Sequence, residues 1–132
     1  MRISKSRYFT KFAHKEKITD TQLINTVQDI AQNLIDANLG NGVIKQRIAR
    51  QGQGKAKSYK SIIFYKTERF CLFVYGFAKN HQDNISNEEL QNFKLAAKEV
   101  LKYNTQQLNK LVNDGAFIET MLEKSENVDE TL

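Results

Sequence analysis

Proline and tryptophan are absent from the 132 residues of this chain, and cysteine occurs only once. The lone Cys71 forms no disulfide within the chain, which is typical of proteins from a reducing compartment. No run approaches the ~20 apolar residues that a membrane-spanning helix needs, and no apolar segment of a secretory signal follows the basic first residues. These absences predict a cytoplasmic protein without a membrane partner, and the length fits one domain.

Metal-ligating side chains are also scarce. The two histidines, His14 and His81, show no ligand-like spacing with the single cysteine, so no metal or other cofactor is expected. The glycines and lysine of residues 52–55 suggest a phosphate-binding loop, but that motif needs glycine at position 49 and serine or threonine at 56. Ala49 and Ala56 stand there instead. We therefore interpret this segment as a basic loop or a plain hairpin connection.

Acidic residues are missing from one long interval, between Asp36 and Glu68. Residues 1–80 carry a net charge of +10 and residues 81–132 carry −5. A solvated surface normally mixes the two signs, so a one-sign stretch favours a polyanionic partner over a patch that serves solubility alone. The basic residues inside the interval are Lys45, Arg47, Arg50, Lys55, Lys57, Lys60 and Lys66.

The first third of the chain predicts a strand over residues 1–5 and a helix over 7–15. A second helix opens with a capping box, in which Thr19 and Gln22 each satisfy a free backbone N–H of the first turn. Its apolar stripe runs to Leu34, and residues 38–42 are expected to stop it, with Gly40 as a left-handed cap. The members of the stripe are Leu23, Val27, Ile30 and Leu34.

The pattern then changes to a period of two, which predicts strands over residues 43–50, 59–66 and 70–78. Residues 51–58 are a predicted loop and residues 66–69 a tight turn. Short connections favour antiparallel pairing, so the three strands form a meander. Alternation directs Lys45 and Arg47 to one side of the first strand and Ile44 and Ile48 to the other. In the third strand it groups the aromatic residues with Cys71; these are Phe73, Tyr75 and Phe77.

A second capping box, made by Ser86 and Glu89, opens one long helix that Gly115 is expected to end. An apolar run over 116–122 then docks on the domain, and residues 123–132 form an acidic flexible tail. The predicted fold class is α+β: N-terminal helices packed on an antiparallel β-meander, followed by a C-terminal helix. The helices cover one face of the sheet and leave the other free, within a single domain over residues 1–122.

Basic and aromatic side chains on one sheet suggest RNA as the polyanion, because bases stack on aromatic rings and cations bind the backbone. RNA also carries its own nucleophile, the 2′-hydroxyl. An enzyme can cleave it by removing that proton and neutralising the phosphate as charge develops, without a metal. Lys45, Arg47 and Lys60 are the residues that favour cleavage. Phosphate binding without catalysis is the alternative that composition leaves open.

Several segments together resemble the HigB-type branch of the RelE toxin superfamily. They are GVIKQRIAR at 42–50, GK at 54–55, SYKSIIF at 58–64 and FVYGFAKN at 73–80, preceded by FAHKEKITD at 12–20 and LG at 39–40. The resemblance covers about residues 5–115. It implies a RelE-like fold, a helix-backed antiparallel sheet whose exposed face cuts mRNA, often at the ribosome. It also implies a cognate antitoxin, expected to be a helix-turn-helix protein, that silences the toxin.

Carried over by position, the resemblance makes Lys45 and Arg47 the general base or charge stabilisers, places Lys60 at the scissile phosphate, and adds Lys79 as a phosphate ligand. The expected RNA-binding residues are Arg50, Lys55, Lys57, Tyr75, Phe77, Asn80 and His81. Two positions depart from better-studied relatives. Asn80 stands where a second basic residue is expected, and no tyrosine follows between His81 and Leu95.

Two other functions stay open from the sequence. A ParE-type toxin of the same architecture poisons a topoisomerase and cuts no RNA, and a simple RNA-binding module binds without cleaving. The antitoxin also has two possible docking surfaces. An acidic segment can cover the basic face between Lys45 and Lys60, steered by charge. Otherwise the partner packs on the last helix, around Phe93, Val100 and Leu101.

Overall fold

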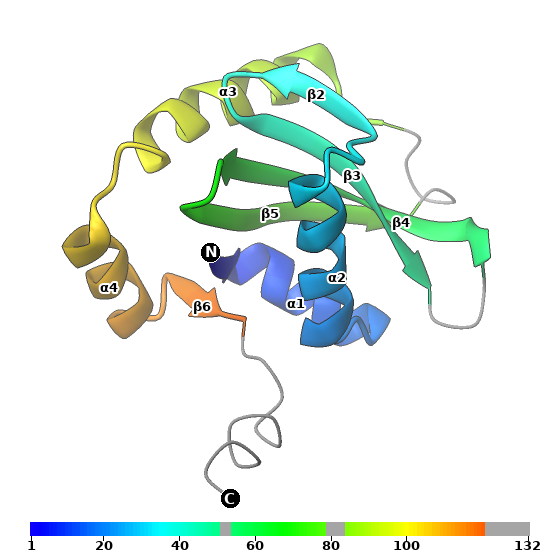
Figure 1. The fold of residues 1–132 in the computed structure, drawn as a ribbon, viewed down its shortest axis with the longest axis horizontal. Coiled ribbons are helices and arrows are strands. Elements are labelled where there is room, and N and C mark those ends of the chain that lie inside the picture. Colours follow the sequence, from blue (N-terminus) through cyan, green and yellow to red (C-terminus); the bar gives the residue numbers. More distant parts are fainter. Residues whose placement is uncertain (51–53, 79–83, 121–132) are drawn as a thin grey trace, which may run out of the picture.

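The computed structural model describes residues 1–50, 54–78 and 84–120, with the backbone alone at 49–50 and 54–58. The fold is α+β, with four helices and one six-stranded sheet (Figure 1). No helix in these ranges has the length and apolar composition to span a membrane. The elements in chain order are β1 (Arg2–Ser6), α1 (Arg7–Glu16), α2 (Asp20–Ala31), β2 (Ala37–Gly40), β3 (Val43–Arg50), β4 (Gly54–Lys66), β5 (Phe70–Ala78), α3 (Asn87–Val100), α4 (Thr105–Asn113) and β6 (Phe117–Glu119).

The sheet is built around the antiparallel meander that the sequence predicts. Its strand order is β2-β3-β4-β5-β1-β6, and only the β1–β5 pair is parallel. Strand β4 begins at Gly54, five residues before the predicted start, and so shortens the expected loop. The short strand β6 pairs with β1, and Arg2 binds Glu119 across that pair at 3.1 Å. The described part of the predicted apolar run therefore docks on the domain, by adding an edge strand. Residues 121–132, with the predicted tail, lie outside the described residues.

The two N-terminal helices begin where local capping chemistry directs. The Ser6 hydroxyl accepts the Phe9 N–H at α1 and donates to the Val74 carbonyl at 2.8 Å, which fixes α1 beside β5. The capping box of Thr19 and Gln22 forms at α2, with both reciprocal bonds present. These contacts confirm both predicted helix starts, because each start depends on residues at most three positions apart.

The end of α2 differs from the prediction. The helix stops at Ala31, and Asn33 takes a left-handed backbone with φ of 68°. Leu34 therefore lies beyond the helix and is exposed, and Gly40 is no helix cap. Gly40 instead ends β2, and Asn41 and Gly42 form the β2–β3 turn. Their φ angles, 94°, 57° and 83° in succession, favour glycine and asparagine. The prediction failed because the same glycines also suit a hairpin.

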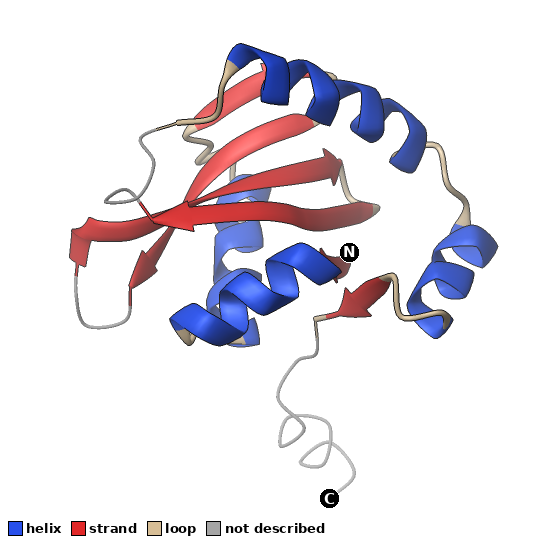
Figure 2. Cartoon of the chain, turned by 180° about the vertical axis from the view of Figure 1, so that it is seen from behind, coloured by secondary structure: helices blue, strands red, loops and turns tan. Residues whose placement is uncertain are grey.

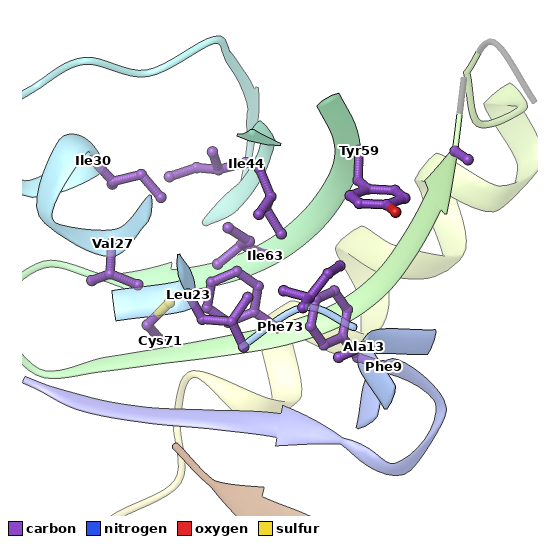
Figure 3. Packing of buried hydrophobic residues seen from close by; sticks show 13 residues of the cluster. Phe9, Ala13, Leu23, Val27, Ile30, Ile44, Tyr59, Ile63, Cys71 and Phe73 are labelled. Atoms are coloured by element: carbon purple, nitrogen blue, oxygen red, sulfur yellow. The ribbon is translucent and has the colours of Figure 1, made fainter. Parts of the chain in front are cut away.

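One face of the sheet, called the α2 face here, carries the first part of the core. Phe9 and Ala13 of α1 and the buried stripe of α2 pack there on β3, β4 and β5, as Figure 3 shows. Cys71 lies in this layer and is fully buried. The stripe consists of Leu23, Val27 and Ile30, and the strand residues beneath include Ile44, Ile48, Ile63 and Phe73.

The opposite face, the α3 face, is covered as well, which contradicts the prediction of a free face. Ala97, with half-buried residues of α3 and the segment after it, packs on a second apolar cluster of the sheet. The predicted single helix over 86–114 is also wrong: it breaks after Val100, and Asn104 caps α4 with its own capping box. The sheet members of this cluster are Val43, Ile62, Phe64, Phe70 and Leu72.

A β-bulge at Val74 changes which face the aromatic residues of β5 occupy. Ile63 pairs with Phe73 and Ile62 with Tyr75, so Val74 has no partner on β4. The extra residue shifts the alternation by one position. Tyr75 therefore packs with the α3-face cluster rather than with Cys71, and Phe77, opposite Lys60, lies on the same face. The predicted grouping is wrong for both residues.

Candidate functional site

Lys45, Arg47 and Lys60 lie on the α3 face, in two adjacent rows across β3, β4 and β5. One row is Lys45, Ile62 and Tyr75, and the other is Arg47, Lys60 and Phe77. Side chains directly opposite each other in an antiparallel pair have Cβ atoms roughly 5 Å apart. The predicted cations of the first two meander strands are therefore neighbours on one surface, and two aromatic residues of β5 adjoin them.

Arg47 and Lys60 are directly opposite in the β3–β4 register, although both are positively charged. Like charges in this position destabilise an antiparallel pair. Together, Arg47 and Lys60 produce a focused positive potential on the surface above β3 and β4, which suits an anionic group bound between them. Such local conflicts are expected at functional sites, because a site that serves stability alone has no reason to retain them.

Asp36 holds the arginine in place. Its Oδ2 accepts the backbone N–H of Arg47 at 2.7 Å and Nε at 3.3 Å, while Oδ1 accepts Nη2 at 3.4 Å. The guanidinium stays partly exposed, with 48% of the side chain accessible. Asp36 thereby orients Arg47 without removing it from solvent.

A buried amide fixes the segment that carries Asp36. Gln46, with 4% of its surface exposed, donates from Nε2 to the Leu34 carbonyl at 2.8 Å. Its Oε1 accepts the Asp36 N–H at 2.9 Å, and the Ser61 hydroxyl donates to the Gln46 carbonyl. Gln46, on the α2 face, therefore fixes the segment from Leu34 to Asp36 through its side chain. Asp36 of that segment in turn orients Arg47, the next residue of β3, on the α3 face.

Lys45 extends toward the start of α3. Its Nζ donates to Asn84 Oδ1 at 3.4 Å, and the same oxygen accepts the Ile85 N–H at 2.9 Å. The Lys45 contact is long and surface-exposed, so it guides the ammonium group without holding it firmly. This lysine is consequently able to exchange Asn84 for another hydrogen-bond acceptor.

Aromatic rings border the basic rows. Tyr75 contacts Phe77 and Phe93, with ring centroids 5.7 and 5.8 Å apart, and stacks on Tyr8 at 5.1 Å with an interplanar angle of 23°. Phe77 was expected to contact RNA, but only 4% of it is exposed, so it supports Tyr75 from below. Tyr8 is 58% exposed and presents its ring to solvent.

The remaining predicted residues are placed only in part. Arg50 pairs with Gly54 where β3 and β4 meet the loop, and Lys55 and Lys57 belong to the first part of β4; their side chains lie outside the description. Lys79, Asn80 and His81 fall outside the described residues. Among the described residues, no three His, Cys, Asp or Glu side chains gather as metal ligands would.

Two other features of the fold are weaker candidates for a site. A pocket of about 140 Å³ lies at the far end of β4 and β5, between Arg2, Lys66 and Arg69. Arg2 is paired with Glu119, and Lys66 donates to the Leu101 carbonyl at 3.1 Å, so two of its three cations already bind the protein itself. Burial raises the pKa of the Cys71 thiol, which keeps it protonated and makes it a poor nucleophile.

Comparison with known families decides the identity. Residues 1–120 match the family described as the RelE toxin of the RelE/RelB toxin–antitoxin system. The chain belongs to the RelE toxin family. A search of curated proteins found no match. The RelE match spans every described element, so this RelE-family toxin is the toxin half of a toxin–antitoxin pair with a cognate antitoxin as its partner.

The structure of this RelE-family toxin also adds residues that the sequence interpretation missed. These are Asp36 and Gln46, which position Arg47; Asn84, which contacts Lys45; and Tyr8, which stacks on Tyr75. Asp36 had one visible signal, as the last acid before the acid-free interval. Phe93, Val100 and Leu101, around which the sequence interpretation placed one of the two possible antitoxin surfaces, are half-buried against the sheet.

Proposed function

We propose that this toxin is a metal-independent endoribonuclease, an mRNA interferase of the HigB type, that cleaves mRNA at the ribosome in the cytoplasm. The observation that carries the proposal is the cluster of Lys45, Arg47 and Lys60 in adjacent rows of one sheet face. Three cations around one anionic group supply the electrostatic stabilisation that a phosphoryl transition state needs. We also propose that the cognate antitoxin is a helix-turn-helix protein.

The reaction uses the substrate's own nucleophile. The 2′-hydroxyl attacks the adjacent phosphorus, the bond from phosphorus to the 5′ oxygen breaks, and the products are a 2′,3′-cyclic phosphate and a 5′-hydroxyl end. A base must take the 2′ proton, and a proton must reach the 5′ oxygen as it leaves. The remaining requirement is positive charge at the non-bridging oxygens.

The contacts divide these roles among the three cations. Arg47 is fixed by Asp36, and a guanidinium does not act as a proton acceptor in proteins, so Arg47 stabilises charge. Among the described residues, the Lys45 side chain makes one hydrogen bond, the long one to Asn84. In its neutral amine form it is the member of the pair that can take the 2′ proton, and the resulting ammonium joins the other two cations at the phosphate. Lys60 lies between Arg47 and Phe77 in the middle strand and contacts the scissile phosphate.

The test is induced expression with mapping of RNA ends. We expect translation to stop and mRNA fragments with 5′-hydroxyl ends to accumulate. Lys45→Ala combined with Arg47→Ala should abolish cleavage, since a lost base or charge-stabilising donor typically costs ~10²–10⁴ in rate. Purified mRNA with and without ribosomes then determines ribosome dependence.

The matched control is Lys98→Ala with Lys102→Ala, which removes the same charge from exposed positions on and after α3. It should cleave as the unchanged protein does, and thermal unfolding should show both pairs folded. Growth arrest with intact mRNA and broken DNA would refute the proposal and favour topoisomerase poisoning. If the protein binds RNA but cleaves none, with or without ribosomes, the proposal is refuted and the protein is a non-catalytic RNA-binding module.

A further inference from the structure

The outward face of α1 carries positive charge alone. Arg7, Lys11 and Lys15 follow one another at spacings of four and are exposed, and His14 lies beside them. None of them forms an ion pair with a described residue. The buried side of the same helix, with Phe9 and Ala13, faces the core.

This arrangement is unfavourable for the helix itself. Like charges four residues apart repel each other, and Arg7 places a cation in the first turn, where the helix dipole favours acids. His14 and Lys15 lie in the last turn, where the dipole favours cations, so the cost is concentrated at the start of the helix. The first turns of α1 and α4 contain no acid, whereas α2 begins with Asp20 and α3 begins with Glu88 and Glu89; of the four, α1 is the one whose first turn carries a cation. A basic face kept at a cost to its own helix indicates an anionic partner.

The position of α1 connects this face to the proposed site. The helix runs alongside β5 in both views of the fold (Figures 1 and 2), and Phe12 contacts Gly76 from the helix side. At its first turn Tyr8 stacks on Tyr75, which lies in the same row as Lys45. Although Tyr8 stacks on Tyr75, 58% of the residue stays exposed.

We propose that α1 is a second RNA-binding element: Tyr8 stacks on a base next to the cleaved bond, and Arg7, Lys11 and Lys15 bind the phosphates that follow. The inference rests on the proposed function. Single-stranded RNA fits both the Tyr8 ring and the three cations, because each nucleotide carries an aromatic base and a phosphate. An acidic segment of the antitoxin would satisfy the cations but leaves the exposed Tyr8 ring without a role.

Binding is measured with 2′-O-methyl RNA, which lacks the nucleophile and stays intact, so the full chain can be used. For a long single-stranded RNA, Arg7→Gln/Lys11→Gln/Lys15→Gln should lower the slope of log affinity against log salt by about 2, at about 0.7 per phosphate. A tetranucleotide should bind almost unchanged. Tyr8→Ala should lower the affinity for both the long RNA and the tetranucleotide by roughly 5- to 150-fold, whereas Tyr8→Phe should retain binding.

The control is Lys98→Gln/Lys102→Gln/Lys110→Gln, which removes three exposed charges elsewhere and should leave both slope and affinity unchanged. If the α1 variant also binds long RNA as the unchanged protein does, the inference is overturned while cleavage by the sheet residues still stands. Loss of antitoxin binding with normal RNA binding would assign α1 to the antitoxin and overturn it equally. Absent cleavage with intact α1-dependent binding refutes only the proposed function.

Discussion

Replacing Gln46 by leucine should both destabilise the toxin and release Arg47. The substitution preserves most of the side-chain volume, so the cavity contribution is small. It removes the bonds to the Leu34 carbonyl and the Asp36 N–H, at 2.8 and 2.9 Å. A hydrogen bond of this kind contributes about 0.5–1.5 kcal/mol, which gives a loss of about 1–3 kcal/mol for the pair.

The lower half of that range is expected, because Leu34 and Asp36 are exposed residues and water can reach their backbone groups. In urea the unfolding midpoint should fall by roughly 0.5–1.5 M with an unchanged slope. The freed segment no longer holds Asp36 against β3, so the Arg47 amide, which donates to Asp36 at 2.7 Å, should exchange with solvent faster. RNA cleavage should decrease with it.

Gln106→Leu is the matched control, because Gln106 is exposed on α4 and its replacement should change stability by less than about 0.5 kcal/mol. If Gln46→Leu leaves both the midpoint and the Arg47 amide exchange unchanged, the reasoning that links the buried amide to the site is refuted. A loss of stability with unchanged Arg47 exchange would limit Gln46 to a structural role.

Two further predictions concern the α2 face. Gly76→Ala should cost about 1–3 kcal/mol in urea unfolding, because a Cβ there would lie 2.5 Å from the Phe12 ring; an unchanged midpoint would contradict the packing. The pKa of the Cys71 thiol is raised by burial, so the folded protein keeps it protonated above pH 9.0 while the unfolded chain ionises it. Stability should therefore fall as pH rises above 9.0, by about 1.4 kcal/mol per pH unit from this group. Cys71→Ala should remove that contribution, and equal slopes in both proteins would contradict it.

Local signals in the sequence determined where most elements begin. The capping boxes at Thr19 and Ser86 open α2 and α3 as predicted. The alternation over 43–50 puts Lys45 and Arg47 on one face of the sheet and Ile44 and Ile48 on the other, also as predicted. In each case the deciding interaction joins residues at most four positions apart. The sequence also identified the basic residues, because an acid-free interval is visible without any coordinates.

Only the tertiary structure decided which face the aromatic residues occupy and how the second face is covered. The bulge at Val74 forms where the Ser6 hydroxyl binds the Val74 carbonyl, 68 positions away along the chain, and it moves Tyr75 beside the cations. The break after Val100 lets α3 pack on the sheet and α4 turn toward β6. Gln46 binds the chain between α2 and β2, and that chain carries Asp36, which binds Arg47. Such contacts depend on packing between distant segments, and no local pattern encodes them.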